Sequence, residues 1–294
     1  VDFYIRLDQF EDAEKLLQST IRQQPNNALS KAVLLTKLGD LYTVTSRYSR
    51  AEKTLNNALA IIEKTTDENS PEYINAMINF GILEMARGKF AQAEEIFDYV
   101  LNEIAPDEPA YISTLNNQGL VYKSLGQPER AEKIFHEIKS IDSVSIGTAH
   151  PDFAITLTNL GFVYTDEGKY IQAERVLTRA LDIQKKNGES RTASYARKLN
   201  NLARVYRLSE NIERAIPIHE QALEIFKKTL SENSADYATT LYNTAIAYWK
   251  VNRRAEAFKY LKKSASVRSS LLGKRHPKYA ESIQKIAEYH WNEK

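Results

Sequence analysis

The chain has 294 residues, and its 40 lysines and arginines against 38 aspartates and glutamates leave a net charge of +2, too balanced to attract nucleic acid or a membrane surface by total charge alone. It contains no cysteine, which excludes disulfides, thiolate metal sites and a cysteine nucleophile; this is typical of a reducing compartment, and we expect a cytoplasmic protein. With only ten glycines, eight prolines and no apolar run of transmembrane length, the composition favours an all-helical protein without a membrane segment.

One pattern recurs along the chain and predicts two helices joined by a short turn. It is clearest over residues 154–183, where Leu157, Leu160, Gly161 and Tyr164 lie three or four apart and share one helical stripe. An alanine follows the turn in every copy. These alanines, at steps of 38, 42, 38, 42, 42 and 42 residues, are Ala13, Ala51, Ala93, Ala131, Ala173, Ala215 and Ala257. We expect Gly161 and Ala173, both small, to let the two helix axes approach closely.

A tyrosine lies nine residues before six of these alanines, and the fixed offset predicts a packing pair in each repeat. The tyrosines are Tyr4, Tyr42, Tyr122, Tyr164, Tyr206 and Tyr248, and Glu84 takes their place in one repeat.

In chain order, the pattern predicts a partial repeat, six helix pairs and a final capping helix. The partial repeat covers 1–27, the pairs cover about 28–66, 70–105, 108–142, 150–187, 192–230 and 234–272, and the cap covers 276–294. Because stacked pairs can share one continuous core, we expect a single array over residues 1–294. Val1 falls inside a repeat and is not an initiator methionine, so we expect a piece of a longer protein.

The connectors between the pairs carry residues typical of helix starts. Ser70-Pro71, His150-Pro151 and His276-Pro277 place a proline where its missing N–H is no loss, and a preceding serine can cap. An aromatic residue follows each start, which predicts an extra buried turn toward the previous pair. These aromatics are Tyr73, Tyr111, Phe153, Tyr195, Tyr237 and Tyr279.

The recurring Leu-x-x-Leu-Gly-x-x-Tyr, as at Leu35 to Tyr42, resembles the tetratricopeptide repeat. The 42-residue step, the His-Pro connectors and Leu-Asn-Asn-Leu-Ala, as at Leu199 to Ala203, are similar to the kinesin-light-chain type of this repeat. The resemblance covers essentially the whole chain. It implies an all-α, right-handed superhelical solenoid of antiparallel helix pairs.

A series of asparagines, which we call the asparagine ladder, also recurs in five repeats. Each lies two residues after the first position of the helical stripe, the position of Leu157. The asparagines are Asn79, Asn117, Asn159, Asn201 and Asn243. Two residues correspond to a rotation of about 200° on a helix, so these amides should point away from the partner helix and into the inner face of the array. In tetratricopeptide proteins that bind peptides, asparagines at this position clamp the ligand main chain, and the resemblance implies that role here. The alternative is that the amides tie adjacent helices together.

Charged and apolar residues flank this asparagine ladder. Arg197 and Arg204 lie four before and three after Asn201, and Lys250 lies on the same stripe, with Lys123 and Arg207 at its edge. Phe162 is an apolar candidate on that stripe. Since guanidinium groups recognise carboxylate or phosphate, we expect an extended, partly acidic ligand with apolar anchors.

The sequence contains no phosphate-binding loop, nucleophile-elbow or metalloprotease motif, and its five histidines are dispersed, so we expect no enzyme, metal or cofactor. We predict a protein-interaction module, the recognition or regulatory part of a larger protein. A second hypothesis is a structural arm that packs against a catalytic module of the same polypeptide, for example a protease, without a free ligand. Binding of nucleic acid to the basic cluster around Arg197 is a weaker third hypothesis.

Overall fold

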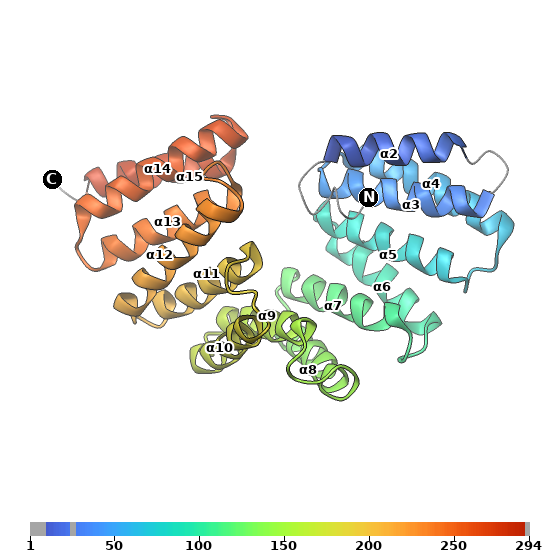
Figure 1. Cartoon of the computed structure of the whole chain (residues 1–294), viewed down its shortest axis with the longest axis horizontal. Helices are drawn as coiled ribbons and strands as arrows, with labels where there is room; N and C mark the ends of the chain where they lie inside the picture. Colours follow the sequence, from blue (N-terminus) through green and yellow to red (C-terminus); the bar gives the residue numbers. More distant parts are fainter. Residues whose placement is uncertain (1–9, 24–27, 292–294) are drawn as a thin grey trace. The chain divides into compact units, whose positions relative to one another are not determined.

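The computed structural model describes residues 10–23 and 28–291, and every regular element in them is an α-helix. The helices are α2 (Phe10–Gln23), α3 (Ala28–Val44), α4 (Tyr48–Thr65), α5 (Pro71–Ala86), α6 (Phe90–Glu103), α7 (Pro109–Ser124), α8 (Pro128–Ser145), α9 (Pro151–Asp166), α10 (Tyr170–Lys186), α11 (Ala193–Leu208), α12 (Ile212–Thr229), α13 (Ala235–Lys250), α14 (Arg254–Leu272) and α15 (Pro277–Trp291). The predicted all-α fold is confirmed (Figure 1). Tyr4 and the rest of the expected first helix lie outside the described residues.

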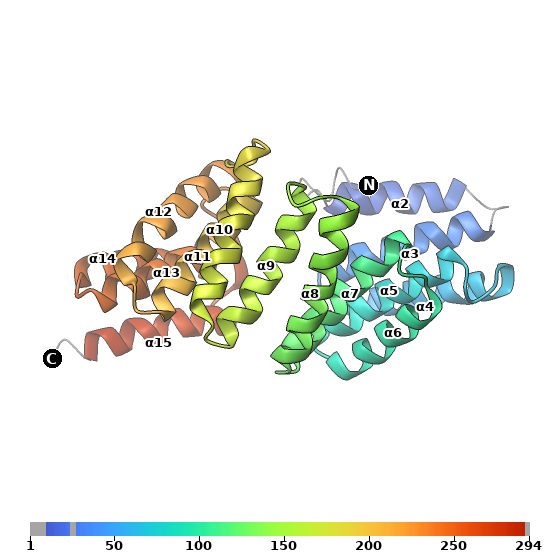
Figure 2. The ribbon, with the colours of Figure 1, turned by 90° about the horizontal axis from the view of Figure 1, so that it is seen from below.

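The helices group into two compact units, residues 1–138 and 139–294, and the division falls inside α8. The recurring pattern predicted one array over the whole chain, whereas the contacts within the structure separate these two units. Within each unit the chain forms helix pairs, such as α3 with α4 and α9 with α10 (Figure 2). We call the first helix of each pair the leading helix and the second the trailing helix. Leading helices of neighbouring pairs also contact one another, as α3 contacts α5 and α11 contacts α13.

Small residues allow each leading helix to lie close to its trailing helix. A Cβ atom added at Gly161 would lie 2.6 Å from Cγ of Leu177, well inside van der Waals contact. Gly81 faces Phe97 in the same way, at 2.5 Å. Leu177 and Phe97 each lie four residues after the repeat's alanine and are at most 1% exposed. The close approach predicted at Gly161 is therefore confirmed.

The repeated tyrosine packs beside the repeated alanine and also bonds to the previous repeat. Tyr42 and Ala51 share one buried cluster, and the Tyr42 hydroxyl donates to Oε1 of Glu14 on α2 at 2.8 Å. The Tyr206 hydroxyl likewise donates to Glu174 on α10 at 2.8 Å, with the guanidinium of Arg214 4.0 Å from the ring centroid. Each such tyrosine thus links two successive trailing helices through one phenol. The predicted packing pair is confirmed at Tyr42.

Helix starts are capped much as the connectors predict. The Ser70 hydroxyl accepts a hydrogen bond from the backbone N–H of Tyr73 at 3.3 Å, with Pro71 in the first turn. In both His-Pro connectors the imidazole Nδ1 takes this role: His150 accepts from the N–H of Asp152 at 3.2 Å, and His276 from that of Lys278 at 3.1 Å. These histidines therefore satisfy otherwise unpaired helix-terminal donors.

Each of the six turns between leading and trailing helix from α3 to α14 contains one residue in the left-handed region. The residue is glycine in three turns, and it is Ser46, Glu210 and Asn252 in the others, with φ of 59°, 62° and 60°. The non-glycine residues carry backbone strain that a glycine would not.

Candidate functional site

The five asparagines lie on the leading helices α5, α7, α9, α11 and α13. Asn79 and Asn117 belong to the first unit, and the other three belong to the second. Four are half-buried, whereas Asn159 is only 8% exposed. The neighbouring stripe residues Leu199 and Leu241 are 4% and 1% exposed, so Asn201 and Asn243 are more accessible than the stripe that packs on the trailing helices.

A pocket of about 450 Å³ opens between the leading helices α3 and α5 of the first unit. Its lining includes Lys37, Asp40, Glu72, Asn75 and Asn79. The Asn79 amide nitrogen donates to the backbone oxygen of Asn75 at 2.8 Å, which engages one of its two donor hydrogens. The pocket therefore offers an amide and charges of both signs between two successive repeats.

Lys37 occupies the ladder position one repeat before Asn79, since the two are 42 residues apart. Lys37 is not among the site residues predicted from the sequence, because the ladder was defined by asparagines alone. Lys37 could have been found by looking for any polar residue at the repeat position that the asparagines occupy.

Three of the predicted basic residues form ion pairs between neighbouring repeats of the second unit, two of them between leading helices and one from α13 to the turn after α11. Arg197 Nε lies 2.8 Å from Asp236 Oδ2, Arg204 Nη2 lies 3.1 Å from Asp166 Oδ1, and Lys250 Nζ lies 2.9 Å from Glu210 Oε1. All six side chains are at least 33% exposed, so each pair contributes little to stability. An acidic ligand would have to compete with a carboxylate already present at each of these three bases.

The partners of these ion pairs were missed from the sequence, although a signal was there. Asp236, Asp166 and Glu210 lie 39, 38 and 40 residues from their bases, which is close to one repeat. Opposite charges separated by about one repeat can therefore meet across neighbouring repeats.

Arg207 differs from the other basic residues. It lies in the last turn of α11, it is half-buried, and its Nε is buried without a hydrogen-bond partner. Burial, and then the like charge of Arg204, lowers the pKa of the Arg207 guanidinium. The charge of Arg207 is therefore poorly compensated.

Lys123 and Phe162 are both half-buried, on α7 of the first unit and α9 of the second. Neither lies among the residues of the pocket between α3 and α5. They remain predicted contacts of the inner face.

Residues 10–23 and 28–291 contain no group of three or more histidine, aspartate or glutamate side chains placed to hold a metal ion. In the same residues, no helix combines the length and the apolar character that crossing a bilayer requires.

Solved structures of low sequence identity share this fold. A Rap protein complexed with Competence and Sporulation Factor is 15% identical, with a TM-score of 0.70 over 93% of this chain and 74% of that chain. The apo form of RapI is 16% identical, with a TM-score of 0.66 over 98% and 83%. The tetratricopeptide-like repeats of a putative kinesin light chain from Podospora anserina are 20% identical, with a TM-score of 0.59 over 70% and 98%.

The sequence itself has no significant match among curated proteins. It does match the family model of the tetratricopeptide repeat over residues 30–102, 110–186 and 194–268. These segments make up most of the chain and follow the helix pairs described above. The chain therefore belongs to the tetratricopeptide repeat family, and its fold is similar to that of kinesin-light-chain repeats.

Proposed function

We propose that this protein binds an extended, partly acidic segment of a partner protein along the leading helices, with the asparagine ladder holding the main chain of the ligand. The binding is non-catalytic and needs no cofactor, and we place it in the cytoplasm. The tetratricopeptide family supports a protein-interaction module in general. A structural neighbour solved with Competence and Sporulation Factor supports ligand binding on this fold.

The observation that carries this proposal is the pocket between α3 and α5. It lies between two leading helices, as a ligand that runs across successive repeats requires, and Asn79 lines it. An amide side chain can donate to a main-chain carbonyl and accept from a main-chain N–H at once. The lining also includes Val33, which is 37% exposed and could contact an apolar side chain.

The test is the double variant Asn201→Ala with Asn243→Ala, titrated against acidic peptide mixtures. Both amides are half-buried on leading helices, so melting should change little. Binding should weaken by about one to two decades, because each lost hydrogen bond costs about 1 kcal/mol. Asn159→Ala should have a smaller effect, because only 8% of that side chain is exposed.

The structural-arm hypothesis makes the opposite prediction. If the double variant binds as tightly as the parent, the leading helices of the second unit are not the binding surface; if Asn79→Ala also leaves binding unchanged, the structural-arm hypothesis is favoured. If it melts early, the asparagines tie helices together.

A further inference from the structure

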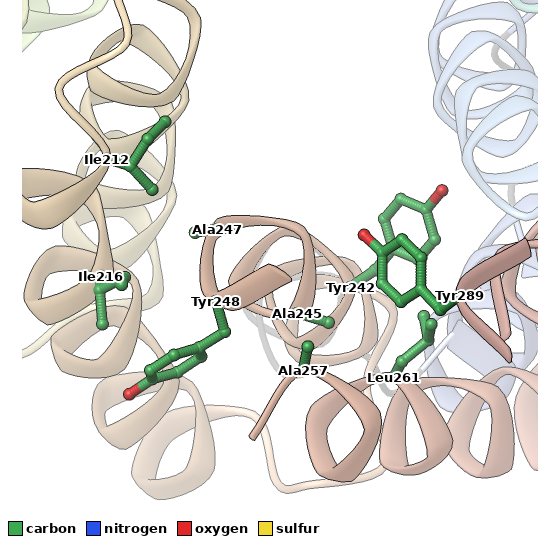
Figure 3. Packing of buried hydrophobic residues seen from close by; sticks show 9 residues of the cluster. All are labelled: Ile212, Ile216, Tyr242, Ala245, Ala247, Tyr248, Ala257, Leu261 and Tyr289. Atoms are coloured by element: carbon green, nitrogen blue, oxygen red, sulfur yellow. The ribbon is translucent and has the colours of Figure 1, made fainter. Parts of the chain in front are cut away.

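The aromatic residues that follow the helix starts also contact the trailing helix of their own pair. The Tyr111 hydroxyl of α7 donates to Oε1 of Glu137 on α8 at 3.3 Å. Nζ of Lys263 on α14 lies 5.2 Å from the centroid of the Tyr237 ring on α13. In this second pair, Leu261 of α14 also packs in an apolar cluster with α13 (Figure 3). An aromatic ring is therefore part of the contact between leading and trailing helix in both pairs.

The first complete pair, α3 with α4, has no aromatic residue at this position. Lys31 of α3 lies 80 residues before Tyr111, and Asn57 of α4 lies 80 residues before Glu137. The repeated alanines of the two pairs have the same separation. Lys31 and Asn57 therefore occupy the positions of the aromatic residue and its partner, and neither side chain carries a ring.

A pocket of about 450 Å³ opens between α3 and α4 at this place. Lys31 and Asn57 both line it, together with the apolar side chains of Leu35 and Ile61 and a second base, Lys64. Its volume lies in the range of small-molecule sites, about 300–1,000 Å³. The first pair thus has a cavity at the position where α7 and α13 place a ring.

This pocket is separate from the pocket between α3 and α5. Leu35 lines the former and Val33 lines the latter, and two residues correspond to a rotation of about 200° on a helix. The two pockets therefore lie on opposite faces of α3, and they share no lining residue. A ligand between α3 and α4 is independent of the proposed binding of a partner segment along the leading helices.

Both lysines of the pocket are available to a ligand. Lys31 is half-buried and Lys64 is exposed, and neither forms an ion pair within residues 10–23 and 28–291. A lysine side chain lays its methylene stem along apolar surface while its ammonium group stays accessible to an anion. The pocket therefore combines apolar surface with two positive charges that have no anionic partner.

We propose that the pocket between α3 and α4 binds an aromatic acid. Its ring takes the position that Tyr111 has in the pair of α7 and α8 and packs on Leu35 and Ile61. Its acidic group pairs with Lys31 and Lys64. An aromatic ring buries a large apolar area in one rigid body, which suits a cavity at a position built for a ring. The ring can belong to a free small molecule or to an aromatic side chain beside an acidic residue of a partner.

The experiment titrates the whole chain with phenylacetate. The parent should bind phenylacetate about tenfold more tightly than hexanoate, which lacks the ring, and than benzyl alcohol, which lacks the charge. Lys31→Tyr supplies the ring from the chain itself, so it should weaken phenylacetate binding at least about tenfold and melt no earlier than the parent. Lys53→Tyr is the matched control, because it makes the same change at an exposed lysine of α4 outside the pocket, and it should bind like the parent.

A second measurement uses the parent alone and does not depend on the folding of Lys31→Tyr. The ring current of phenylacetate should shift the methyl resonances of Leu35 and Ile61 and leave those of Val33 unchanged. Unshifted Leu35 and Ile61 resonances would overturn the site. So would full phenylacetate affinity in a folded Lys31→Tyr, or equal binding of phenylacetate and hexanoate.

Two further titrations distinguish the sources of the ring and separate the two proposals. If a blocked Asp-Phe-Asp peptide binds more tightly than phenylacetate and loses this affinity in Lys31→Tyr, the ring belongs to a partner segment. If phenylacetate binds at least as tightly as the peptide, the ligand is a free aromatic acid. The double variant Asn201→Ala with Asn243→Ala should bind phenylacetate like the parent, so the proposed function can fail without this site, and this site without the proposed function.

Discussion

The two units are built from the same kind of helix pair but differ in the ionisable side chains that they bury. The first unit buries Glu84, which is 3% exposed and is held by Arg87 at 2.8 Å and Lys89 at 3.1 Å. The second unit buries one acid, Asp142, at 4% exposure, and three bases, Lys198, His219 and Arg268, at 5%, 0% and 3% exposure.

These buried bases are less well matched than Glu84. Arg268 donates to Glu281, whereas Lys198 donates only to the neutral Ser194 hydroxyl and the His219 nitrogens have no partner. Burial lowers the pKa of Lys198 as well as that of His219. The same repeat fold therefore accommodates buried ionisable groups of both kinds.

The largest effect should come from filling the close helix contacts, which the two units share. Gly161→Val in the second unit and Gly81→Val in the first should each destabilise the protein by about 3 kcal/mol, because the added atoms would overlap Leu177 and Phe97. Urea denaturation followed by circular dichroism measures both. Ile155→Val is the control on α9, at a side chain that is 50% exposed. If the losses in unfolding free energy of the two variants differ by more than twofold, the units differ in packing as well as in charge.

Acid should act on the second unit through His219. Its folded-state pKa of about 3 lies below the ordinary value near 6.5, so the unfolded chain takes up the proton first and stability falls as the pH drops from 6.5 toward 3. Between pH 7 and pH 5 the loss should be about 2 kcal/mol. His219→Leu, which restores the residue type of the other repeats, should remove this loss and melt no earlier at pH 7. Identical pH profiles of parent and variant would contradict the buried, neutral state of His219.

The tyrosine bonds should contribute similarly in both units. Tyr206→Phe removes the hydrogen bond to Glu174, and Tyr42→Phe removes the bond to Glu14, both 2.8 Å long. Each change should cost about 1–2 kcal/mol, because the acceptor is charged and partly buried. Chemical denaturation of the two variants compares them directly. If only one of the two variants is destabilised, the tyrosine hydrogen bond contributes to stability in that unit alone.

The smallest effect should come from the turns. Ser46→Gly in the first unit should stabilise the protein by about 0.5 kcal/mol, because glycine adopts the observed φ of 59° without strain but gains more entropy in the unfolded chain. Asn252→Gly in the second unit should gain less, since asparagine tolerates this region better than serine. Melting temperatures would show the ranking, and destabilisation by Ser46→Gly would contradict it.

The sequence by itself determined the all-α repeat fold, the close approach at Gly161 and the capped helix starts. These features depend on residues near one another in the chain or on a pattern that recurs at a constant step. The repeating pattern is sufficient to predict these features because every repeat packs on its neighbours in the same way. The family follows from the same recurrence.

Only the tertiary structure decided which charges are already paired. Arg197 and Arg207 look alike in sequence, yet Arg197 contacts Asp236, 39 residues away, whereas Arg207 has a buried Nε without a partner. The difference depends on which side chains of neighbouring repeats meet, and on burial that no local pattern reports. His219 shows the same limit. Only the packed helices show that its two nitrogens are buried and meet no partner, because hydrogen bonding depends on atoms brought together across repeats.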